Sequence, residues 1–108
     1  MKRQAAIENG VELLDRRRPD WLSKIDLDQL DLSNGYCCIL GEVYAGEDPS
    51  DRYRSGYAIG RYRLGISDAP ERYGFALPLD GHGDEIGDYD RLTSAWKRVI
   101  RKLRKERG

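Results

Sequence analysis

The sequence predicts a mainly α-helical, compact single-domain bundle of about four to six helices, with room for a minor short β-hairpin or edge strand. Three observations support this class: an amphipathic C-terminal segment, a second apolar periodicity near the N-terminus, and two glycine stop signals between them. The 108 residues match the commonest size of one domain, so a single unit is expected over residues 1–108. Ten aromatic residues (seven Tyr, two Trp and one Phe) supply apolar anchors that disordered chains lack.

Residues 92–103 carry the clearest helical signal. At about 100° per residue, the apolar side chains fall on a stripe roughly 100° wide. They are Leu92, Trp96, Val99, Ile100 and Leu103. The opposite side is basic and consists of Lys97, Arg98, Arg101, Lys102, Arg104 and Lys105. We therefore expect a helix capped by Asp88, packed through Trp96 on the first helix and on residues 36–44, with a cationic face in water.

A first helix is expected over residues 2–17, where apolar residues recur at spacings of four and three. They are Ile7, Val11 and Leu14. Gly10 within this helix costs about 1 kcal/mol relative to alanine. Pro19 ends the helix, because its ring keeps the preceding residue out of helical geometry. Pro19 also suits the first position of a short second helix that turns Trp21, Leu22 and Ile25 inward.

Two central segments are ambiguous. Residues 36–44 are strongly apolar and fit a buried strand as well as a helix. Residues 61–66 alternate like a strand, yet Tyr53, Tyr57 and Leu64 fit a helix capped by Asp51.

Two glycine motifs favour helices in the second of these segments. Leu64-Gly65-Ile66 has the form of a helix stop with a left-handed glycine, and Tyr73-Gly74-Phe75 repeats it. Between them, Asp68-Ala69-Pro70-Glu71 has the pattern of a capping box. We therefore expect two helices here, the second very short. Residues 75–79 contain Pro78, so they are extended or at most an edge strand.

The net charge of zero conceals an uneven division. Residues 91–108 hold eight Lys and Arg and one Glu, whereas residues 1–90 hold eleven basic and eighteen acidic residues. The commoner arrangement is that the acidic body neutralises the basic helix within one molecule. The alternative is that the positive pole meets an anionic partner.

The sequence indicates a cytoplasmic protein. No stretch approaches the ~20 apolar residues needed to cross a membrane, and the N-terminus lacks the apolar core of a secretory signal. The neighbouring Cys37 and Cys38 rarely bridge without strain, so free thiols in a reducing compartment are expected.

Candidates for catalysis or metal binding are weak. The loop 80–91 alternates acidic residues, His82 and glycines, but it differs from a calcium loop at both decisive places. Glu85 occupies the sharp-turn glycine position and Arg91 the bidentate glutamate position. The two thiols lie in an apolar run typical of core residues, and no phosphate-cradling glycine pattern occurs. We expect no metal, no cofactor and no enzyme; an enzyme using His82 and carboxylates is the least supported alternative.

The candidate partner-binding residues are cations of the C-terminal helix: Lys97, Arg98, Arg101, Lys102 and Lys105. They could contact phosphates, with binding that falls steeply with salt. Because aromatic and amide base readers are missing from this face, such binding would tolerate any sequence. The triplets Arg52-Tyr53-Arg54 and Arg61-Tyr62-Arg63 could add stacking partners. The plainer alternative turns the tyrosines into the core and the arginines outward.

Several short motifs occur together along most of the chain. They are residues 5–15, Pro19-Asp20-Trp21, Ile25-Asp26, Cys38-Ile39-Leu40-Gly41, Leu64-Gly65, Tyr73-Gly74-Phe75 and Leu92-Thr93-x-x-Trp96. In combination they resemble a set of small actinobacteriophage proteins without an established activity. Glu42, where glutamine is expected, and the basic tail depart from that pattern.

The resemblance implies a phage-encoded protein of the infected host's cytoplasm, and it supplies no catalytic residues. The expected function is non-enzymatic binding of a host or phage macromolecule, such as a host protein bound during takeover of the cell or inhibition of its defences. The binding protein would be a monomer or a small homo-oligomer. The alternative is sequence-tolerant nucleic-acid binding through the basic C-terminal helix.

Overall fold

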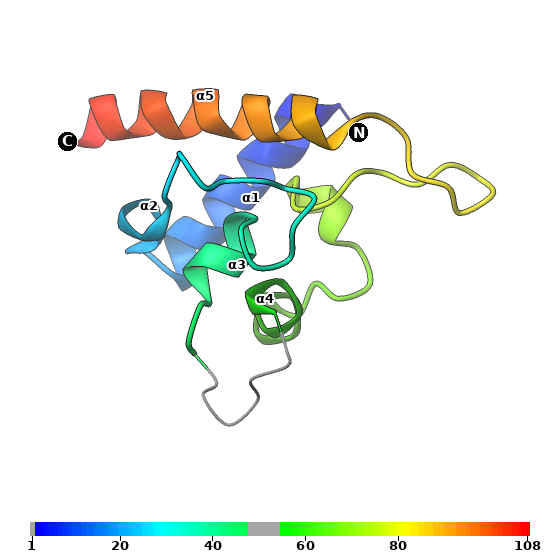
Figure 1. Cartoon of the computed structure of the whole chain (residues 1–108), viewed down its shortest axis with the longest axis horizontal. Coiled ribbons are helices and arrows are strands. Elements are labelled where there is room, and N and C mark those ends of the chain that lie inside the picture. Colours follow the sequence, from blue (N-terminus) through cyan, green and yellow to red (C-terminus); the bar gives the residue numbers. More distant parts are fainter. Residues whose placement is uncertain (1, 48–54) are drawn as a thin grey trace.

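The predicted helical class is confirmed by the computed structural model, which describes residues 2–47 and 55–108 (Figure 1). Its elements are α1 (Arg3–Arg17), α2 (Trp21–Lys24), α3 (Ile39–Val43), α4 (Gly56–Leu64), the 3-10 helix η1 (Pro70–Tyr73) and α5 (Tyr89–Arg107). Within the described residues there is no sheet. The minor β-structure that the sequence left room for is reduced to one isolated antiparallel bridge between Leu79 and Glu85.

Helix α5 lies along one side of the molecule, with α1 crossing beneath it (Figure 1). Trp96 is fully buried, and a Cβ atom placed on Gly10 of α1 would lie 3.1 Å from its ring. The expected packing of Trp96 on the first helix is therefore confirmed. The ring also stacks on Phe75, with centroids 5.8 Å apart, and meets Trp21 edge to face at 6.2 Å. Its indole Nε1 donates a 2.6 Å hydrogen bond to the carbonyl oxygen of Gly74.

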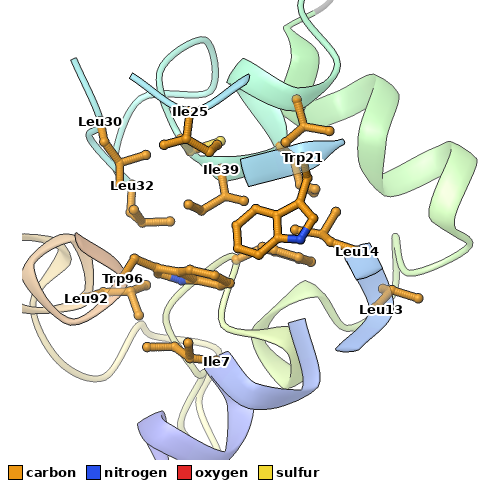
Figure 2. Close-up of a cluster of buried hydrophobic side chains, with 14 of the residues drawn as sticks. Ile7, Leu13, Leu14, Trp21, Ile25, Leu30, Leu32, Ile39, Leu92 and Trp96 are labelled. Atoms are coloured by element: carbon orange, nitrogen blue, oxygen red, sulfur yellow. The ribbon is translucent and has the colours of Figure 1, made fainter. Parts of the chain in front are cut away.

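The two tryptophans occupy the middle of the core (Figure 2). Ile7 of α1 lies on one side of them, and Ile25 and Ile39 lie on the other. All three aliphatic side chains are 4% exposed or less and belong to one continuous buried cluster. The core thus joins α5 to the N-terminal half of the chain, and residues 36–44 contribute to it through α3.

Residues 36–44 form a turn followed by the short helix α3, which settles the helix-or-strand alternative in favour of a helix. Cys38 caps this helix, since its Sγ accepts a 3.3 Å hydrogen bond from the N–H of Gly41. Helix α4 packs against α3 at glycines. A Cβ atom on Gly56 would overlap the carbonyl oxygen of Gly41. Only residues without a side chain permit so close an approach of two backbones.

Ser55 is the N-cap of helix α4. Ser55 Oγ accepts a 3.2 Å hydrogen bond from the N–H of Ala58. The predicted cap Asp51 and the predicted inward residue Tyr53 lie outside the described residues. Residues 61–64 belong to α4, so the strand alternative for residues 61–66 is wrong.

Both glycine stops are confirmed. Gly65 has φ +71° and the N–H of Ile66 donates to the carbonyl oxygen of Arg61 at 3.0 Å. Gly74 has φ +73° and the N–H of Phe75 donates to the carbonyl oxygen of Pro70 at 3.2 Å. This 6→1 hydrogen bond across a left-handed glycine satisfies carbonyls that a helix end leaves free.

The very short helix expected between the two glycine stops forms as η1, with Pro70 at its start, but two details of the predicted helix starts are wrong. The capping box at residues 68–71 does not form, because η1 begins at Pro70 and Ala69 occupies its N-cap without a side-chain hydrogen bond. Helix α2 begins at Trp21, with Asp20 at its N-cap, so Pro19 precedes the helix instead of opening it. Both helices are only four residues long, so each begins one or two residues later than its sequence signal predicted.

Candidate functional site

Helix α5 is the rigid element on which the predicted binding residues stand. Asp88 caps it, because its carboxylate accepts a 2.7 Å hydrogen bond from the N–H of Asp90, and this predicted cap is confirmed. Leu92, Trp96 and Ile100 are 3% exposed or less. A helix capped at its start and buried along one side holds the side chains of its other side in a fixed arrangement.

Two arginines of α5 are committed to the fold. Arg104 donates from Nη2 to the carbonyl oxygens of Leu22, at 2.7 Å, and Ile25. These carbonyls lie at the end of α2, where a helix leaves its last carbonyls without an intrahelical partner. The expectation that Arg104 belongs to the exposed basic side is therefore wrong.

Arg107 forms a bidentate ion pair with Asp15 of α1, at 2.8 and 2.9 Å. The same carboxylate accepts a 2.9 Å hydrogen bond from Nε1 of Trp21. The hydrogen bond from Arg107 is the main reason why the pKa of Asp15 lies below its ordinary value, with a smaller contribution from Trp21. This arrangement ties the last turn of α5 to α1 and α2.

The remaining predicted cations form what we call the cationic face. Its members are Lys97, Arg98, Arg101, Lys102 and Lys105. Lys97 is half-buried and the other four are exposed. Taking Leu92 as the origin at 100° per residue, those four fall within an arc of about 100° centred opposite the buried stripe.

Few contacts within the molecule neutralise this face. Lys102 lies 4.0 Å from Glu106 along the helix, in a largely exposed pair. Ser33 hydrogen bonds lower the pKa of Asp31, and the charge of Lys97 adds a smaller effect. Over residues 2–47 and 55–108, no ion pair or hydrogen bond engages the side chains of Arg98, Arg101 or Lys105. The acidic residues that the structure describes therefore leave most of this charge unpaired.

The cationic face continues onto the start of α1. Lys2 and Arg3 line an open depression of about 500 Å³ together with Arg91 and Arg98. Asp90 lies in the same depression and offsets part of the charge. At 1.5 Å per residue, cations extend for about 21 Å along α5 between Arg91 and Lys105. Sequence reasoning missed the contribution of α1, since nothing in the sequence brings residues 2 and 3 beside residue 91.

The groups considered for catalysis have other surroundings. Cys38 is buried at the cap of α3, and burial raises the pKa of its thiol to about 11. His82 lies in the hairpin of residues 78–86, which projects beyond the helices, well away from α3 (yellow in Figure 1). Asp80 accepts hydrogen bonds from the N–H groups of His82, at 2.7 Å, and Asp84, at 3.0 Å. The acidic loop is thus organised as a turn, and the described residues contain no group of three His, Cys, Asp or Glu arranged to hold a metal ion.

Glu42, the departure noted in the sequence, supports the backbone. Its Oε2 accepts a 2.6 Å hydrogen bond from the N–H of Asp26, while Oε1 is buried without a partner in the described structure. Burial raises the pKa of this carboxyl. The position is structural, and it links α3 to the segment after α2.

The second tyrosine-arginine triplet, residues 61–63, does not extend the cationic face. Residues 52–54 lie outside the described residues. In the second triplet the side chain of Tyr62 is 77% exposed, so the interpretation that turns it into the core is wrong. Arg61 lies over the ring of the half-buried Tyr57, 4.6 Å from its centroid. These residues belong to α4, on the side of the molecule opposite α5 (Figure 1).

Comparison with family models, with curated proteins and with solved structures found no match to this chain. In the part of the chain that the structure describes, every helix is too short or too polar to cross a membrane.

Proposed function

We propose that this protein is a non-enzymatic, phage-encoded binding protein that engages a host or phage macromolecule through the cationic face of α5. The observation that carries the proposal is the division of the cations of one helix. Arg104 and Arg107 are paired with groups of α1 and α2, whereas Arg98, Arg101 and Lys105 have no side-chain partner among the described residues. The phage origin rests on the resemblance alone.

The cost of this arrangement supports a binding role. Arg98 and Lys102, and likewise Arg101 and Lys105, are four residues apart and so are neighbours on the helix surface. Each such like-charge pair destabilises a helix by about 0.2–0.5 kcal/mol. An anionic partner would relieve this repulsion and would be attracted to the face from a distance.

The positions of the reactive groups support a role without catalysis. The Cys38 thiol acts as a helix cap inside the core, and its raised pKa leaves little of the nucleophilic thiolate. His82 lies in the hairpin and is not beside it. A nucleophile and its base have to be within hydrogen-bond reach of each other.

An affinity capture from lysate of infected actinobacteria tests the proposal. The wild-type protein should retain a partner that the double variant Arg101→Glu, Lys105→Glu loses. The matched control Arg17→Glu, Arg63→Glu makes the same change in net charge on exposed residues of α1 and α4, and should retain the partner. The proposal fails if no partner is retained, or if the control loses it equally.

The second candidate function is sequence-tolerant nucleic-acid binding. It is favoured by the composition of the arc itself, which presents Lys and Arg without an apolar or aromatic centre. Each phosphate neutralised on duplex DNA contributes about −0.9 to the slope of log K against log salt. In a mobility-shift series at rising salt, the wild type should bind at low salt and lose this binding steeply. The Arg101→Glu, Lys105→Glu variant should show no binding at any salt concentration. Binding that survives both the salt and the substitutions would exclude this candidate.

A further inference from the structure

An apolar cleft opens beside the cationic face. It has a volume of about 410 Å³ and lies between the start of α1, η1, the hairpin and the first turn of α5. Apolar side chains line most of it, namely Ala6, Leu77, Pro78, Leu79, Ile86 and Leu92. Clefts of this size and character are where proteins take up apolar groups of a ligand.

The rim of the cleft is apolar and held in place. Leu79 is 55% exposed and Ile86 is 51% exposed. The hairpin that carries them is closed by the Leu79–Glu85 bridge and by a 2.8 Å hydrogen bond from the N–H of Ile86 to the carbonyl oxygen of Pro78. Glu85 also accepts a hydrogen bond from the Tyr89 hydroxyl at the start of α5. Two large apolar side chains are thus kept in water at fixed positions, which is unfavourable unless something covers them.

The charges beside the cleft favour carboxylates at one end of the occupant. Within the cleft, Arg3 and Arg72 are balanced by Glu71 and Asp88. In the adjoining depression four cations, Lys2, Arg3, Arg91 and Arg98, outnumber the single carboxylate of Asp90. Arg3 lines the cationic depression of α1 and α5 as well, so the cleft and the cationic surface are continuous.

We propose that the cleft is a docking site for a segment of a partner protein in which apolar side chains are followed closely by carboxylates. The apolar side chains enter between Leu79, Ile86 and Leu92, and the carboxylates meet Arg3 and the adjoining cations of α5. This inference rests on the proposed function and gives the partner a chemical class. A nucleic acid has no aliphatic side chains to bury against the apolar walls, so a protein partner is favoured over a nucleic acid.

The probe is a display library of short random peptides, selected on the immobilised protein. Enriched peptides should combine Leu, Ile or Phe with neighbouring Asp or Glu. One enriched peptide is then measured by fluorescence anisotropy. The variant Leu79→Ser, Ile86→Ser should weaken its binding at least tenfold, and Arg3→Glu should do the same. These side chains are exposed, so the substitutions leave the core intact.

Matched controls separate the cleft from general effects. Tyr62→Ser removes a more exposed apolar ring elsewhere, and Arg63→Glu reverses an exposed charge on α4; both should bind as the wild type does. If the peptide loses affinity only with Arg101→Glu, Lys105→Glu, the cleft is not the site while the proposed function stands. Enrichment of no peptide, or of peptides without acidic residues, overturns the inference. If every variant binds the peptide equally, the inference fails, and the proposed function fails as well for protein partners.

Discussion

The two sides of α5 use the same residue types for opposite purposes. On the inner side, Arg104 and Arg107 find carbonyl and carboxylate partners that hold α5 against α1 and α2. On the outer side, Arg101 and Lys105 face water. The difference shows that the basic character of a helix says little by itself, because its position relative to the buried stripe decides whether a cation stabilises the fold or is free to meet a partner.

Removing the centre of the inner side should have the largest effect. Trp96→Ala deletes a fully buried ring, its stacking on Phe75 and its hydrogen bond to Gly74. We expect the free energy of unfolding to fall by about 3–5 kcal/mol, measured by urea denaturation. For a domain of this size such a loss can unfold the protein altogether. A decrease below about 1 kcal/mol would mean that α5 does not complete this core.

A smaller effect separates the two kinds of arginine within one turn of the helix. Arg104→Ala should lower the free energy of unfolding by about 1–3 kcal/mol, because two carbonyls at the end of α2 lose a charged donor. Arg101→Ala, three residues earlier and exposed, should change it by less than about 0.5 kcal/mol. Equal effects of the two substitutions in denaturation would remove the distinction between the sides.

The ion pair at the end of α5 should appear in the pH dependence of stability. The pKa of Asp15 is below its ordinary value of 3.8 in the folded protein, so its contribution is present above that pH and is lost as the pH falls through the lowered value. Asp15→Asn should reduce stability by about 0.5–1 kcal/mol at pH 7 and flatten the stability curve below pH 3.8. Thermal unfolding of both proteins across this range measures it. The same acid loss in the variant would assign the pH dependence to other carboxyls.

The outer side should give the smallest change in stability and the largest change in binding. Replacing Arg101 and Lys105 by glutamine removes charge without reversing it. Each substitution should alter the free energy of unfolding by no more than about 0.5 kcal/mol. The Tm of this variant, and of the Arg101→Glu, Lys105→Glu variant used in the capture experiment, checks that the loss of binding there is a property of the surface. A fall comparable to that of Arg104→Ala would show that these residues, too, belong to the fold.

The sequence predicted α5, its cap and the helical class, because periodic patterns and capping residues act over a few neighbouring positions. It misjudged Arg104 for a reason that the helical wheel itself contains. At 100° per residue Arg104 falls about 40° beyond the apolar stripe, nearer to it than any other cation predicted for the basic side, and Arg107 falls within the stripe. Grouping residues by charge hid an angular signal that was present.

Other features depend on segments far apart in the chain. Gly10 looked like a weakness of the first helix, but a Cβ atom there would overlap the carbonyl oxygen of Tyr73, which lies against α1 only in the folded protein. The close approach of Gly41 and Gly56 in α3 and α4 has the same origin. The cleft beside Leu79 and Ile86 likewise needs α1, the hairpin and α5 together. Local sequence patterns carry no information about these tertiary contacts between distant segments.

Cys38, the cap of α3, can also serve as a probe of local opening of this helix. A thiol-selective reagent will reach the half-buried Cys37 in the native protein, but it will reach Cys38 only when α3 separates from its surroundings. The rate of the second modification therefore counts local opening events. A comparison of the Cys38 modification rate with and without a bound partner will show whether binding at α5 changes the opening of α3 on the other side of the core.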